Sequence, residues 1–138
     1  MEEGANSLGK RTAAASVISK NNVVADYTRP EVAFDVLFGN RVTKPLPLHV
    51  KEERSEWSLS PDRMFIGTGV FVQIDGPYHR TVRQEAKSKW EDELFNQNGF
   101  RVLHIDSGLL MVKRYHPHVL KETEAFLRSD EKSRRLPA

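Results

Sequence analysis

The run VFVQID, residues 70–75, constrains the fold more than any other part of the sequence. Its branched apolar side chains occupy every second position, which is the period of a β-strand with one apolar face. The same period sends Gln73 and Asp75 together to the other face. Residues 62–66 are typical of a short preceding strand, and Gly67-Thr68-Gly69 is typical of a tight turn between the two strands. We therefore expect a hairpin that presents two polar groups near its end.

A helix and another strand follow this hairpin. Apolar residues at i+4 steps predict an amphipathic helix over residues 81–98, and these residues are Val82, Ala86, Trp90 and Leu94. Gly99 is a natural C-terminal cap, and FRVLHI, residues 100–105, is a strong strand signal. Because a helical crossover suits parallel strands, the pattern predicts an α/β fold with a central mixed β-sheet flanked by helices.

The other segments are less regular. Residues 1–25 are small and polar and predict a flexible N-terminal arm. Thr28-Arg29-Pro30-Glu31 predicts the start of a helix that ends at Gly39-Asn40 and buries Val32, Phe34, Val36 and Leu37. Residues 42–59 contain prolines and predict irregular strands or a loose hairpin. After residue 107 we expect one or two helices, so that one domain spans residues 26–128 and a basic tail, residues 129–138, frays.

Composition restricts the class of protein and the metals it can bind. With 138 residues, of which 38% are hydrophobic and 29% charged, the chain is expected to form one folded domain. It contains no cysteine, so a bound metal must use oxygen or imidazole ligands, which favours Mg²⁺ or Mn²⁺. The sequence has neither a long apolar run nor the apolar core of a secretion signal, so we expect a soluble, cytoplasmic protein that does not enter membranes.

Three oxygen-bearing side chains predict a metal site. Asp62 begins one strand of the expected hairpin, and Gln73 and Asp75 end the other, so the hairpin brings them together. Such a cluster can hold a divalent cation that polarises a phosphodiester and lowers the pKa of a bound water. His79 follows closely enough to act as general base, general acid or phosphate ligand, and Glu31 from the first helix completes the site.

These residues also carry a family resemblance. The run from Ser60 to Ile105 resembles the core of endonucleases similar to very-short-patch mismatch repair enzymes, a branch of the PD-(D/E)xK superfamily. The most specific parts are DG followed by PYH, and then a charged helix that ends in NGFRVLHI. The resemblance implies a restriction-endonuclease-like fold and metal-dependent DNA cleavage. In it, Pro61-Asp62 matches the family's PD, Gln73 its second acidic residue, Asp75-Gly76 its DG, His79 its histidine and Glu31 its helix glutamate.

The sequence departs from the family at two positions. Gln73 stands where a carboxylate is usual, so metal affinity is expected to be lower, and Asp75 stands where the wider superfamily has its lysine. Lys87 on the following helix is the best placed lysine to replace it. We expect phosphate contacts from the basic residues of the same segment, Arg80, Arg83, Lys87 and Lys89, whose alternative interpretation is a solvated helix face.

Three functions remain open from the sequence. The leading hypothesis is a metal-dependent endonuclease or nickase that acts on DNA, with RNA a possible substrate, and that cuts a mismatch, a junction or a specific site as repair or homing enzymes do. A second hypothesis is a non-catalytic RNA-binding module, because the RAP domain is similar in its DGPxH run. A third is a structural or regulatory protein that has kept the fold and lost the activity. Neither a monomer nor a homodimer is favoured.

Overall fold

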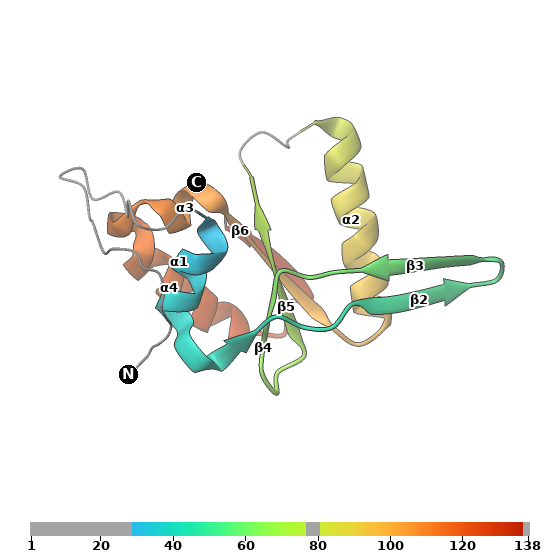
Figure 1. Cartoon of the computed structure of the whole chain (residues 1–138), viewed down its shortest axis with the longest axis horizontal. Helices are drawn as coiled ribbons and strands as arrows, with labels where there is room; N and C mark the ends of the chain where they lie inside the picture. The colour runs from blue at the N-terminus through green and yellow to red at the C-terminus, as the bar shows by residue number, and fades with distance from the viewer. Residues whose placement is uncertain (1–28, 77–80, 137–138) are drawn as a thin grey trace.

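The central strand of the protein is β5, which has one antiparallel and one parallel neighbour. The computed structural model describes residues 29–76 and 81–136, so the predicted flexible arm lies outside the described residues. Its sheet has the order β1-β4-β5-β6-β7, and β2 and β3 form a separate hairpin (Figure 1). The elements are α1 (Pro30–Phe38), β1 (Val42–Thr43), β2 (Leu48–Glu52), β3 (Ser55–Leu59), β4 (Arg63–Phe65), β5 (Val70–Asp75), α2 (Val82–Gln97), β6 (Arg101–Asp106), α3 (Ser107–Met111), α4 (His116–Leu127) and β7 (Ser133–Leu136), with short 3₁₀ turns at Gly39–Arg41 and Lys113–Tyr115.

The predicted strand–helix–strand unit is confirmed. β5 pairs antiparallel with β4 across the turn and parallel with β6, and α2 makes the crossover between β5 and β6. A long helical connection is what a parallel pair requires, since a short turn cannot return the chain to the same end of the sheet. The predicted mixed α/β architecture with helices flanking the sheet is therefore correct.

The C-terminal segment corrects one prediction. Ser133–Leu136 does not fray but forms β7, which pairs parallel with β6 at the edge of the sheet. Leu136 is buried in the main core, and this apolar anchor holds a short strand that is otherwise charged. The segment has no alternating apolar pattern that would predict a strand, because only one of its side chains, Leu136, is buried.

Apolar side chains cover both faces of the sheet. On one face, α1, α3 and α4 pack against Val70, Val72, Leu103 and Ile105. On the opposite face, α2 and the β2–β3 hairpin pack against Phe71 and Val102. This division follows the period of two along β5, because Phe71 lies on the α2 side, as do Gln73 and Asp75 further along the strand.

The two long predicted helices exist, but each buries a narrower face than expected. In α1 the buried residues are Ala33, Phe34 and Phe38, whereas Val32 and Val36 are exposed. The helix starts at Pro30, and Gly39, at φ +59°, ends it as predicted. In α2 only Leu94 and Phe95 are fully buried, and Val82 and Ala86 face solvent.

The first half of α2 therefore has little apolar core beneath it and is stabilised by a cap at its start and an aromatic contact near the middle of the helix. The Thr81 hydroxyl accepts a hydrogen bond from the Gln84 amide and caps the helix start. Trp90, halfway along, packs edge-to-face against Trp57 of β3, with 5.1 Å between the ring centroids. Figure 1 shows α2 and the β2–β3 hairpin on the same side of the sheet, with the hairpin extending away from it. The loose hairpin expected over residues 42–59 is thus confirmed for β2 and β3.

Within the described ranges, no helix is long and apolar enough to cross a lipid bilayer.

We predict that Thr123→Val stabilises the fold. The Thr123 side chain is fully buried on α4, and its hydroxyl has no hydrogen-bond partner among the described residues. Removing an unsatisfied buried hydroxyl at nearly constant volume is expected to raise the free energy of unfolding by about 1 kcal/mol. Urea unfolding measures the change, and Thr123→Ser, which keeps the hydroxyl and loses a methyl group, should lower stability instead. A valine variant less stable than the wild type would contradict this interpretation.

Candidate functional site

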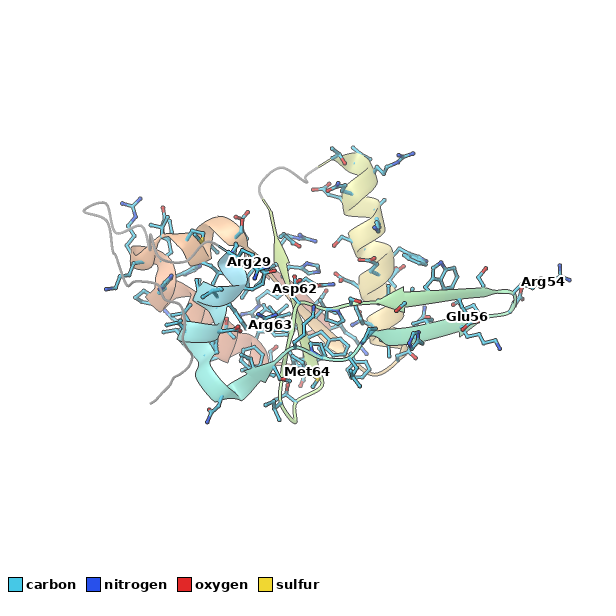
Figure 2. The ribbon with its side chains drawn as sticks, viewed as in Figure 1. Arg29, Arg54, Glu56, Asp62, Arg63 and Met64 are labelled. Atoms are coloured by element: carbon cyan, nitrogen blue, oxygen red, sulfur yellow. The ribbon has the colours of Figure 1, made fainter. Side chains whose placement is uncertain are left out.

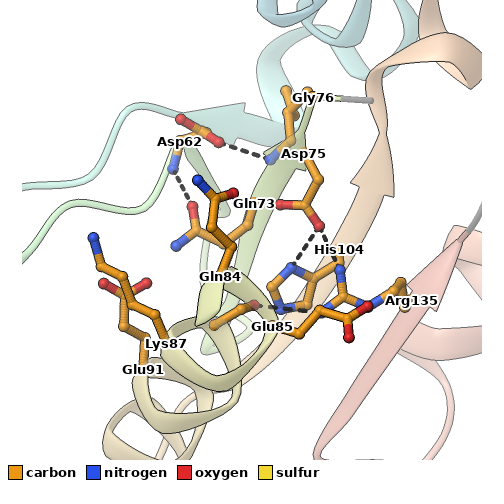
Figure 3. Close-up of a pocket in the computed structure, with 12 residues that line it drawn as sticks. Asp62, Gln73, Asp75, Gly76, Gln84, Glu85, Lys87, Glu91, His104 and Arg135 are labelled. Atoms are coloured by element: carbon orange, nitrogen blue, oxygen red, sulfur yellow. Dashed lines mark hydrogen bonds and ion pairs between the residues drawn. The ribbon is translucent and has the colours of Figure 1, made fainter. Parts of the chain in front are cut away.

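A polar cleft lies where the C-terminal end of β5 meets the first half of α2. Its volume is about 370 Å³, and Figure 3 shows most of its wall. The lining side chains that carry charge or polar groups come from β5, β6, β7, α2 and the residue before β4: Asp62, Gln73, Asp75, Gln84, Glu85, Lys87, Ser88, Glu91, His104 and Arg135. The hairpin prediction is therefore correct in placing Asp62, Gln73 and Asp75 at one site.

Asp62 is tied to β5 by three hydrogen bonds. Its Oδ2 accepts from the Ile74 amide at 2.7 Å, and its own amide donates to the Val72 carbonyl oxygen at 3.1 Å and to Gln73 Oε1 at 3.2 Å (Figure 3). The carboxyl group is partly buried, and this burial raises its pKa above the ordinary value, against the lowering effect of the Ile74 hydrogen bond. The position of Asp62 is thus fixed by the backbone of the neighbouring strand.

Three charged groups also act on Asp62, among them its chain neighbour Arg63 (Figure 2). The negative charge of Glu31, from the first turn of α1, raises the pKa of Asp62, while Lys44 and Arg63 lower it. Glu31 is therefore near enough to act on the charge of Asp62, although it is not among the residues that line the cleft. Arg63 is itself held by Asp35, whose carboxylate oxygens accept from its Nε at 2.8 Å and one of its terminal nitrogens at 2.9 Å.

Asp75 is neutralised by two cationic neighbours. Its Oδ2 lies 3.1 Å from His104 Nδ1 and accepts a hydrogen bond from Arg135 at 2.7 Å. These neighbours come from β6 and β7, and strand pairing places Gln73, His104 and Arg135 in one row across the sheet. Arg135 also donates to Ser88 Oγ of α2 at 3.3 Å, so that the edge strand closes one end of the cleft.

His104 bridges two carboxylates in the interior. Its side chain is buried, and its Nε2 lies 2.8 and 2.9 Å from the two oxygens of Asp92 on α2. Burial lowers the pKa of His104, but the hydrogen bonds and negative charges of Asp75 and Asp92 outweigh it and raise the pKa to about 9. At neutral pH the ring is therefore an imidazolium that donates from both nitrogens. Since both ring nitrogens contact carboxylates, His104 holds Asp75 in position.

The remaining predicted site residues divide into three groups. Lys87 lines the cleft, as does Glu91. Burial raises the pKa of Glu91, and the positive charge of Lys87 partly opposes this increase. Arg83 and Lys89 are exposed on α2 and do not line the cleft. His79 and Arg80 lie outside the described residues.

Sequence analysis missed the cation side of the site. His104 and Asp92 were not singled out, and Arg135 was predicted only as part of the basic tail. His104 nevertheless stands in a strand where the period of two puts it on the same face as Val102. A histidine on the helix-covered face of a predicted central strand needs a polar partner, and this was the available signal. Arg135 gave no such signal because its segment was not recognised as a strand.

The oxygen groups fit a divalent cation in part. Asp62 is a partly buried carboxylate with a raised pKa, and it lies near the negative Glu31. A bound cation would balance the negative charge of these two groups. Gln73 adds a neutral oxygen beside it. Asp75 fits less well because its Oδ2 already faces His104 and Arg135. Across residues 29–76 and 81–136, no three histidine, cysteine or acidic side chains are grouped to hold a metal ion by themselves.

Comparison with known proteins gave no relative: no protein-family model, no curated protein and no solved structure matches this chain.

We predict that stability falls as pH rises through the pKa of His104. The folded-state pKa of about 9 exceeds the ordinary value of 6.5, so its contribution is complete below pH 6.5 and is lost as pH passes 9. The shift corresponds to about 3 kcal/mol of unfolding free energy. Urea unfolding from pH 6 to pH 10 measures the decline, and Asp92→Asn, which removes one carboxylate partner, should move it to lower pH. Nitrogen chemical shifts that show His104 neutral at pH 7 would contradict the bridge.

Proposed function

We propose that this protein is a metal-dependent endonuclease that hydrolyses phosphodiester bonds of DNA, with a fold of the restriction-endonuclease type. The observation that carries the proposal is the convergence of Asp62, Gln73, Asp75 and Lys87 on one cleft at the end of β5. Carboxylate and amide oxygens on one side and an ammonium group on the other match the needs of an anionic phosphodiester that is attacked by water.

The side chains have separable roles in this proposal. Asp62 and Gln73 hold Mg²⁺ or Mn²⁺, with Glu31 adding negative charge nearby. When bound, the cation supplies Lewis-acid activation of the phosphate and lowers the pKa of water. Asp75 is fixed by His104 and Arg135, so that its carboxylate keeps one orientation in the cleft. Lys87 contributes positive charge for the phosphate from the opposite wall.

One observation favours a second candidate, a nucleic-acid-binding module without catalysis. Gln73 carries no charge, and Asp75 is already paired with His104 and Arg135. Such a site has one fewer anionic ligand than a strong metal centre, whereas its basic groups remain able to bind phosphate. Metal binding and cleavage separate the two candidates.

Manganese binding is the first test of the proposal. We expect the wild-type chain to bind one Mn²⁺ in a calorimetric titration at pH 7.5, and Asp62→Asn to weaken the affinity at least about tenfold, because affinity follows the charge of the ligands. Asp130→Asn is the matched control, since Asp130 is exposed and is not a lining residue of the cleft. A wild-type chain that does not bind Mn²⁺ would favour the binding module.

Cleavage is the second test. The full chain is incubated with supercoiled plasmid, a mismatched duplex, a four-way junction and single-stranded RNA, each with Mg²⁺, Mn²⁺ or EDTA. We expect metal-dependent nicking of at least one DNA substrate. The rate for Asp62→Asn should fall about 100-fold or more, because the variant lacks the negative charge that binds the activating cation. Asp130→Asn should cleave as the wild type does. Binding without cleavage of any substrate would sink the nuclease proposal and leave the module.

A further inference from the structure

Lys44 lies beside Asp62 but outside the cleft. Its ammonium group donates a hydrogen bond to the Pro61 carbonyl oxygen at 3.0 Å, directly before Asp62 in the chain. Its positive charge lowers the pKa of the Asp62 carboxyl, so the two charges act on each other. Asp62 is one of the residues that line the cleft, whereas Lys44 is not. The ammonium group therefore extends the polar surface past Asp62.

The backbone holds Lys44 in this place. Thr43 pairs with Met64 of β4, which fixes the chain immediately before Lys44. Pro45 follows, and a residue before proline is restricted to extended conformations. The lysine thus leaves the sheet at a defined point and in a defined direction, and only its side chain remains free to move.

The charge of Lys44 is less compensated than that of its cationic neighbours. Arg63 forms two hydrogen bonds to the Asp35 carboxylate, and Arg135 is paired with Asp75. Lys44 has a neutral carbonyl as its hydrogen-bond acceptor and no ion-pair partner within the described ranges. An ammonium group has three donors, so two remain available for an incoming anion.

We propose that Lys44 is a nucleic-acid-binding residue that holds the phosphate next to the one bound in the cleft. This inference rests on the proposed function only in taking a nucleic-acid strand as the ligand of the cleft. Adjacent phosphates repeat along such a strand, so a strand with one phosphate in the cleft presents the next one to a cation just outside it. A lysine serves there as a point charge for the backbone and is indifferent to the base sequence.

The test measures binding apart from cleavage. The full chain is titrated with a fluorescent DNA duplex and a single-stranded oligonucleotide in EDTA, at several salt concentrations. Lys44→Met is expected to weaken binding about 5- to 10-fold and to reduce the slope of log K against log salt by about 1. Lys51→Met is the matched control, because Lys51 is an exposed lysine of β2. Lys44→Arg, which keeps the charge, should restore most of the affinity.

The outcomes distinguish this inference from the proposed function. Unchanged affinity and salt slope in Lys44→Met would overturn the role of Lys44 and leave the nuclease proposal intact. An equal loss in Lys44→Met and Lys51→Met would also overturn it, because a diffuse charge effect would then explain the data. A wild-type chain that binds neither nucleic acid in EDTA would overturn the role of Lys44, and cleavage in the presence of Mg²⁺ or Mn²⁺ would then decide the nuclease proposal separately. All variants must also unfold at the same urea midpoint, so that a loss of affinity reflects a lost contact and not a loss of folded protein.

Discussion

The parallel pairing of β5 with β6 is the interaction on which the fold and the candidate site both depend. Its register sets Gln73 opposite His104. The parallel pairing of β6 with β7 then sets His104 opposite Arg135. A slip of one residue would turn each side chain to the other face of the sheet. The buried Val70 and Val72 oppose such a slip, because they would leave the core. The apolar half of the strand therefore fixes the position of the polar half.

The buried imidazolium couples the stability of the sheet to the order of the cleft. Removing one partner of a buried ion pair costs several kcal/mol because a charge is left uncompensated. His104 has a carboxylate on each side, one from β5 and one from α2, and so links the strand to the helix that crosses over it. This link holds the second half of α2, close to the buried Leu94 and Phe95. In the first half, where Val82 and Ala86 face solvent, the hydrogen bond from Arg135 to Ser88 adds a polar contact to the sheet.

The sequence predicted the elements that depend on local patterns and missed those that depend on distant partners. The period of two in VFVQID was sufficient to place Gln73 and Asp75 on one face, and Gly39 was sufficient to end α1. The exposure of Val32 and Val36 was not predictable, since it depends on which side of α1 meets the sheet. Likewise, Ser133–Leu136 has no strand pattern of its own and becomes a strand because β6 offers an open edge.

The two carboxylates of the cleft differ in their surroundings, and this difference supports a division of labour. The carboxyl group of Asp62 is partly buried and lies near the negative Glu31, and both effects raise its pKa against the opposing charges of Lys44 and Arg63. Asp75 faces His104 and Arg135 and brings no excess negative charge to the cleft. In the proposed nuclease, a divalent cation would therefore bind on the Asp62 side, whereas a phosphate would meet less repulsion on the Asp75 side. A metal-assisted phosphodiesterase requires this separation, because its cation and its anionic substrate must occupy neighbouring positions in one cleft.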